Sequence, residues 1–275
     1  MLRRYILFLK KHPLITAAIG IVYVMVCLKS IKAESNFQGF LLRTLMTGAA
    51  MFFLYQVSGD KTLTASYNDT WYVIKVGIGF LLMAMPIGAL GFLNNAEAPL
   101  WDNVPLQILT GFLLMMSVGL FEEMSFRALI NDAIIYHFRD KKYVFVLSAL
   151  VSSLVFGAAH VVGFEFTSWL AIAQGIGKTL QAGVFGLSLL FLYWKTRNIW
   201  ACGVVHGLYD FILSLSSFVY NSPSTASYVM TDERAMTAIC VYAVFTLLNL
   251  FIFFLIYKKI GKKIVIRRSE KSGKK

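Results

Sequence analysis

Long apolar segments separated by short polar breaks make up most of this chain of 275 residues. A helix that crosses a membrane needs about 20 mostly apolar residues. Segments of this kind predict about eight spanning helices, at residues 13–28, 38–57, 71–93, 104–130, 143–163, 169–194, 198–219 and 235–257. The pattern therefore predicts an all-α fold in the form of a polytopic membrane helix bundle.

Composition supports this interpretation, and charge adds an orientation. The chain is 58% hydrophobic and 15% charged, with a mean hydropathy of +0.68, which excludes an ordinary soluble domain. Cations gather before the first predicted span and after the fourth, sixth and last, at Arg3, Arg4, Lys10, Lys11, Arg139, Lys141, Lys142, Lys195, Arg197 and the tail after Tyr257. With eight spans these clusters share one side, so the positive-inside rule places both termini in the cytoplasm.

The basic tail bears on the partners of the chain. The net charge is +12, and the tail holds Lys258, Lys259, Lys262, Lys263, Arg267, Arg268, Lys271, Lys274 and Lys275. A basic run beside a membrane attracts anionic lipid, each cation adding about 1 kcal/mol. The alternative interpretation, nucleic-acid binding, is disfavoured by this position. The expected partners are therefore the lipid bilayer and, at the basic tail, anionic lipid; nucleic acid is not expected as a partner.

Ionisable residues inside the predicted spans direct attention to chemistry. Glu122, Glu123 and Arg127 lie in the fourth span, His160 in the fifth, and His206 with Asp210 in the seventh, as the sequence has them. A charged side chain near the bilayer centre costs at least about 2.5 kcal/mol, so such residues usually face a protein interior or a wet cavity and act there.

Helical spacing divides these residues into roles. Glu123 and Arg127 are four apart and can pair on one face. Glu122 points about 140° away from Arg127 and has no cation nearby in the sequence, so it remains available for a different partner. Phe156 precedes His160 by one turn, and His206 shares a face with Asp210.

Packing alone would explain any one of these groups, as a buried ion pair or as a hydrogen bond between helices. Three spans that each contribute ionisable groups favour a converging site instead. A carboxylate and an imidazole around one water make a general base, and a second imidazole can stabilise an oxyanion. These groups together suit the hydrolysis of an amide.

Three motifs on separate predicted spans carry a family resemblance. Glu122-Glu123-x-x-x-Arg127, Phe156-x-x-x-His160 and His206-x-x-x-Asp210 follow in that order. The chain resembles the CPBP family of intramembrane proteases, which contains the type II CAAX prenyl endopeptidases and the bacterial Abi or bacteriocin-processing proteins. The resemblance implies a protease core at residues 105–220. Hydropathy alone places helices without motifs before it, at 1–104, and a last helix with a basic cytoplasmic tail after it, at 221–275.

The resemblance also implies residue roles. Glu122 and His160 would activate the attacking water, and His206, assisted by residue 210, would form the oxyanion site. Glu123 and Arg127 would form the supporting ion pair, beside Phe156. Many relatives have Asn where this chain has Asp210, and an ionised Asp cannot donate to an oxyanion. Asp210 could therefore be protonated, or it could accept a hydrogen bond from His206 and hold that ring; Asp in bacterial members of the family favours the second.

The sequence leaves alternatives for a bound metal, for the substrate and for the biological role. One Glu and two His could hold zinc, but the zinc-protease pattern His-Glu-x-x-His is absent. The family resemblance implies a metal-free, glutamate-dependent mechanism, so we expect no metal and no cofactor. The expected substrate is a membrane-associated peptide or protein: a leader peptide, a pheromone precursor or a prenylated C-terminus. The compact chain and Asp210 resemble a bacterial plasma-membrane member. Rival functions are a transporter using Glu122 as a proton carrier, and a non-enzymatic regulator or bacteriocin self-immunity protein that binds a membrane partner.

Overall fold

The computed structural model describes residues 2–30, 33–93, 103–220, 229–230 and 233–261. Helices account for nearly all of these ranges, and no strand occurs within them, which confirms the predicted all-α class. The chain divides into two compact units. The first is Met1–His137 with Thr196–Ser224, and the second is Phe138–Lys195 with Thr225–Lys275. Each unit is described by itself below.

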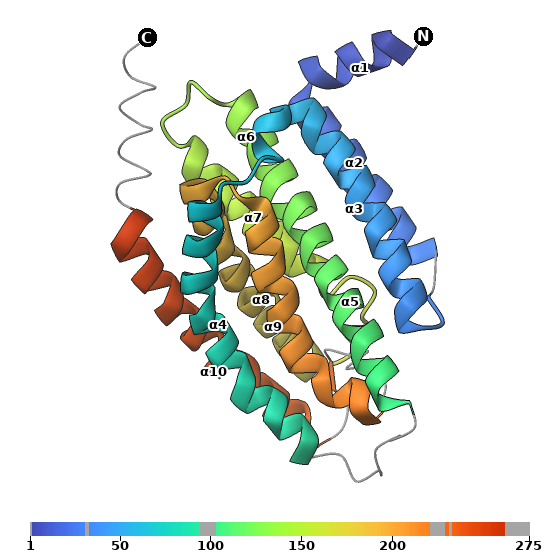
Figure 1. Ribbon diagram of the computed structural model, residues 1–275. Helices are drawn as coiled ribbons and strands as arrows, with labels where there is room; N and C mark the ends of the chain where they lie inside the picture. Colours follow the sequence, from blue (N-terminus) through green and yellow to red (C-terminus); the bar gives the residue numbers. More distant parts are fainter. Residues whose placement is uncertain (1, 31–32, 94–102, 221–228, 231–232, 262–275) are drawn as a thin grey trace. The chain divides into compact units, whose positions relative to one another are not determined.

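The first unit contains most of the helices. They are α1 (Leu2–Lys11), α2 (Pro13–Ser30), α3 (Asn36–Ser58), the short η1 (Asp60–Thr62), α4 (Tyr67–Leu93), α5 (Val104–Glu122), η2 (Glu123–Ile130), α6 (Asn131–His137) and α9 (Ile199–Tyr220). Figure 1 shows α9 side by side with α4 and α5, and these are the most extensive helix contacts of the unit. The chain reverses between them, so α5 and α9 run antiparallel.

Glycines bring α9 into close contact with both neighbours. A Cβ atom on Gly207 of α9 would lie 2.6 Å from the carbonyl oxygen of Met115 on α5, and a Cβ atom on Gly77 of α4 would lie 2.6 Å from Cγ2 of Val205. No side chain fits at either point. Small residues allow this approach of helices in a membrane, and here they place the middle of α9 against the end of α5.

The second unit consists of α7 (Val144–Ala159), α8 (Trp169–Thr196), α10 (Ala235–Ile256) and η3 (Tyr257–Gly261). Gly157 of α7 meets the backbone of Thr179 on α8, and Gly177 of α8 meets Tyr242 of α10. The side chain of Gln174 also accepts a hydrogen bond from the backbone N–H of Met230, at 2.7 Å, and donates one to the backbone carbonyl oxygen of Met230, at 2.9 Å. Close packing thus joins the three helices, and Gln174 binds the segment that precedes α10.

The predicted count of eight spans is not confirmed. Within the described residues, six helices are long and apolar enough to cross a membrane, at Asn36–Ser58, Tyr67–Leu93, Val104–His137, Trp169–Thr196, Ile199–Tyr220 and Ala235–Lys259. A seventh would be α1 with α2, which are bent by 108° at the break before Pro13. The helix predicted at 143–163 is α7, whose 16 residues extend about 24 Å against a hydrocarbon core of about 30 Å.

The orientation of the chain stays a prediction, with both termini in the cytoplasm. The helix α1 carries Arg3, Arg4, Lys10 and Lys11 with exposed Tyr5, Leu7 and Phe8, a composition suited to the surface of a membrane. The predicted anionic-lipid site falls mainly on residues 262–275, which lie outside the described residues. The division at residues 104 and 220 likewise stays a prediction.

Candidate active site

The segment that carries the two adjacent glutamates is not a regular α-helix. At Glu123 the helix α5 passes into η2, a π-helix that runs to Ile130 and then into α6. A π-helix is wider than an α-helix and is frequently found at functional sites. All eight residues of η2 are buried. The predicted helix at 104–130 is therefore present, but with a different winding at the position of the motif.

Glu123 is fully buried and has two partners. Its Oε1 atom lies 3.4 Å from Nε of Arg127 and 2.8 Å from Nδ1 of His206. The pairing with Arg127 was predicted from their spacing; the contact with His206 on α9 was not. An ionised carboxylate only accepts hydrogen bonds, so this contact places a proton on Nδ1 of His206. Glu123 thereby fixes both the orientation and the tautomer of the ring.

Glu122 lies beside the other nitrogen of the same imidazole, without a hydrogen bond to it. Its Oε2 atom is 3.6 Å from Nε2 of His206, and its side chain is 19% exposed. Among the described residues, this oxygen has no hydrogen-bond partner. Arg43 of α3 contributes a positive charge that acts on Glu122, and its guanidinium lies over the ring of Phe121 at 5.7 Å. The sequence pattern gave no sign of Arg43, because it lies far away along the chain.

Asp210 completes the group in the first unit. Its Oδ2 atom lies 3.4 Å from Nε2 of His206, one helical turn away on α9. Asp210 is therefore on the Nε2 side of the ring, whereas the short hydrogen bond that holds the ring comes from Glu123 on the Nδ1 side. The predicted proximity of His206 and Asp210 is present. Of the alternative roles of Asp210, neither is tested by this geometry.

The donor atoms of Glu122, His206 and Asp210 all lie within 4.8 Å of one another. One imidazole and two carboxylates are ligands that zinc accepts, at about 2.0–2.2 Å each. The arrangement could hold a divalent cation by donor type and spacing, and equally forms a cluster of ionisable groups without one. The expected absence of a metal stays a prediction.

His160 and Phe156 belong to the second unit. His160 follows the last residue of α7 rather than lying within a long span. Its Nδ1 atom is 2.9 Å from the carbonyl oxygen of Phe156, and the two rings are 4.5 Å apart. Because a carbonyl only accepts, Nδ1 carries the proton and Nε2 is the proton-accepting nitrogen of the neutral ring. A ring with a proton-accepting Nε2 is the form that could assist a general base.

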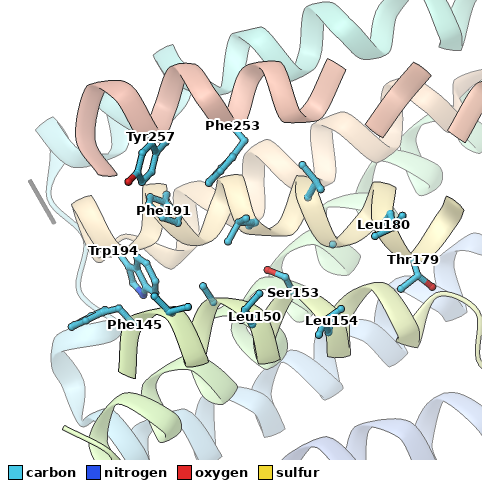
Figure 2. A pocket seen from close by; sticks show the side chains of 15 residues that line it. Phe145, Leu150, Ser153, Leu154, Thr179, Leu180, Phe191, Trp194, Phe253 and Tyr257 are labelled. Carbon is cyan, nitrogen blue, oxygen red and sulfur yellow. The ribbon is translucent and has the colours of Figure 1, made fainter. Parts of the chain in front are cut away.

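The second unit also contains an apolar pocket of about 340 Å³. Figure 2 shows side chains from α7, α8 and α10 around it, with the hydroxyl of Ser153 among them. Its lining is Phe145, Val146, Ala149, Leu150, Ser153, Leu154, Thr179, Leu180, Gly183, Val184, Leu187, Phe191, Trp194, Phe253 and Tyr257. This lining lacks a carboxylate or an imidazole, so the pocket suits hydrocarbon and has no general base.

Comparison with known proteins supports the resemblance in the motif-bearing part of the chain. Residues 104–212 match the family model described as type II CAAX prenyl endopeptidase Rce1-like. This part of the chain is similar to the Rce1-like domain, which is consistent with the CPBP family, a family of proteases. No curated protein and no solved structure matches the chain. The apolar helices together with this domain make the chain a multi-pass membrane protein.

Proposed function

We propose that this protein is an intramembrane endopeptidase in which Glu122 is the general base. The observation that carries the proposal is the different environment of two adjacent carboxylates. Glu123 is fully buried between Arg127 and His206. Glu122 is partly exposed, and its Oε2 atom lies 3.6 Å from Nε2 of His206, beyond hydrogen-bond distance. One carboxylate thus organises the site, and the other can accept a proton from a water molecule.

In the proposed reaction, Glu122 accepts a proton as the oxygen of the water forms a bond to the peptide carbonyl carbon. When protonated, His206 can donate through Nε2 to the developing oxyanion while Nδ1 stays bonded to Glu123. The carbon–nitrogen bond then breaks, and the proton held by Glu122 passes to the leaving amine. The products are a carboxylate and an amine, and no oxidant or further reactant is needed.

Two roles rest on the family resemblance alone. His160 would assist Glu122 in activating the water, for which the proton-free Nε2 of its neutral ring is suited. Asp210 lies 3.4 Å from Nε2 of His206 and would accept a hydrogen bond from this nitrogen in the protonated ring until the oxyanion forms and takes over that hydrogen bond. We propose no metal in this reaction. Activity that is lost with a chelator and restored by zinc would contradict that part of the proposal.

The proposed substrate is a peptide or small protein at the membrane. The family description names prenylated CAAX proteins, whereas Asp210 resembles bacterial members, whose substrates would be leader peptides or pheromone precursors. We propose the bacterial plasma membrane and a substrate of the second kind. Nothing in the geometry of the site favours a non-enzymatic regulator or a self-immunity protein.

The test compares the membrane peptides of cells that produce the wild-type protein with those of cells that produce Glu122→Gln at the same level. Glutamine keeps the size of the side chain but cannot accept the proton. We expect cleavage products that are present with the wild type and missing with the variant, and their sequences would identify the substrate. Identical peptide sets in both cells, with equal membrane levels, would contradict the protease function.

A further inference from the structure

A second polar contact joins the helices that carry the proposed catalytic groups. Arg197 lies two residues before the first residue of α9, and its guanidinium donates from Nη1 to Oδ1 of Asp132 at 2.9 Å and from Nη2 to Oδ2 at 2.6 Å. Asp132, on α6, is 2% exposed. Thr62 accepts a further hydrogen bond from Nη2, at 2.8 Å, and Ser58 donates to Asp132 at 2.7 Å. Such two-pronged pairs of arginine and carboxylate fix geometry as well as charge.

The positions of the two contacts match along both helices. Asp132 lies nine residues after Glu123 (123 to 132), and Arg197 lies nine residues before His206 (197 to 206). Because the segments run antiparallel, the contacts Glu123–His206 and Asp132–Arg197 connect positions with the same offset along the sequence. Both contacts can form together only when α9 has this register.

Near His206, the face of α9 that meets α5 is formed by glycines. A Cβ atom on Gly203 would lie 2.7 Å from Cδ2 of Leu120, and one on Gly207 would lie 2.7 Å from Cε of Met116. Glycine permits this close approach but presents no side chain that would resist sliding. A slip of one helical turn is about 5.4 Å, which would remove His206 from Glu123. Polar contacts, which are costly to leave unsatisfied in a membrane, oppose such a slip.

The backbone of Arg197 provides independent support. Its φ angle is +55°, and it is the one non-glycine residue with a positive φ in the part of the chain described. This conformation is unfavourable for a non-glycine residue and persists where surrounding contacts enforce it. Glycine would adopt it without strain but would supply no guanidinium. An arginine here is therefore explained by its side-chain contacts.

We propose that Arg197 and Asp132 are positioning residues, which hold α9 in the register that places His206 against Glu123 and beside Glu122. The link to peptide hydrolysis rests on the proposed function. The register itself does not, so it can be measured separately. Misplacing a catalytic group by about 1 Å can cost about 100-fold in rate, and loss of this contact permits displacements larger than that.

Arg197→Gly is the decisive variant, because it removes the guanidinium and relieves the backbone strain at the same time. Arg139→Gly is the matched control, since Arg139 is 76% exposed. In a protein whose three cysteines are replaced by alanine, Phe112→Cys on α5 is combined in turn with Leu208→Cys, Phe211→Cys or Leu215→Cys on α9. The rings of Phe112 and Phe211 are 5.4 Å apart, so the 112–211 pair should cross-link fastest.

We expect Arg197→Gly to spread cross-linking to positions 208 or 215 and to lower the cleavage rate by about 100-fold with little change in KM. Arg197→Lys, which keeps the charge but not the two-pronged geometry, should lie between it and the wild type. Arg139→Gly should change neither measurement. Unchanged cross-linking in Arg197→Gly would overturn the proposed positioning role, whatever the activity. Shifted cross-linking in a protein without peptidase activity would uphold the role of Arg197 in the register and refute only the proposed function.

Discussion

The cluster around His206 and the apolar pocket of the second unit differ in whether their side chains need polar partners inside a membrane. The pocket is lined mainly by hydrocarbon and aromatic side chains, which pack against lipid as well as against protein. The cluster brings Glu122, Glu123, Arg127, His206 and Asp210 together among apolar helices, and each would be costly there without a partner. A cavity in a membrane protein is thus weak evidence of chemistry, whereas a group of mutually dependent ionisable residues is strong evidence.

The largest effects should come from the two imidazoles. We expect His160→Ala and His206→Ala each to lower the rate of peptide cleavage by about 10²–10⁴-fold, because the proposed reaction uses one ring to activate water and the other to stabilise the oxyanion. The measurement is cleavage by purified protein at equal folded concentration. A full rate in His160→Ala would remove the second unit from the proposed chemistry.

Arg127→Met should mainly lower the free energy of unfolding, more than it lowers the cleavage rate. Arg127 is 1% exposed and lies 3.4 Å from the fully buried Glu123. Removing one partner of a buried ion pair costs about 3–5 kcal/mol, since the other charge remains. Denaturant unfolding in detergent measures this loss. Arg139→Met, at an exposed position, is the control, and equal stability of the two variants would show that Glu123 does not depend on Arg127.

Asp210→Asn should have a moderate effect. Asn keeps an oxygen that can accept a hydrogen bond from Nε2 of His206, and the ring is also held by Glu123 at 2.8 Å. We expect a loss of no more than about tenfold, about the value of one ordinary hydrogen bond. Cleavage rate at matched membrane levels is the measurement. Complete loss would mean that the charge of Asp210 takes part in the reaction.

These predictions also show how far the sequence could lead. Apolar length predicted the helices that became α3, α4, α8, α9 and α10, and residue spacing predicted the pairing of Glu123 with Arg127. The bend before Pro13 and the shortness of α7 changed the count of spans. Hydropathy does not distinguish a surface helix or a short helix from a span.

The missing parts of the site share a physical cause. The contacts of Glu123 with His206 and of Asp132 with Arg197 depend on the register between helices far apart in sequence. No local spacing encodes that register. The π-helix at Glu123–Ile130 was also not predicted, since the 3.6-residue period assumed for the motif is that of a regular α-helix. What the sequence does indicate is which ionisable residues need partners.

Filling the apolar pocket should have the smallest effect and would sharpen the contrast between the two regions. Ala149→Leu combined with Ser153→Leu adds hydrocarbon without touching an acid or a base, so we expect cleavage of an unmodified peptide within about twofold of wild type. Overpacking can cost about 1–3 kcal/mol, so folded protein must be measured in parallel. A selective loss of cleavage for a lipid-modified peptide would instead identify the pocket as a binding site for the hydrocarbon chain.

The most direct test of the division between the two glutamates is the cleavage rate and stability of Glu122→Gln beside those of Glu123→Gln. Because Glu122 is partly exposed and Glu123 is fully buried in contact with Arg127 and His206, the proposed roles predict different losses. Glu122→Gln should retain wild-type stability and lose about 10²–10⁴-fold in rate, whereas Glu123→Gln should unfold more easily. Wild-type cleavage by stably folded Glu122→Gln would contradict the assignment of Glu122 as the general base.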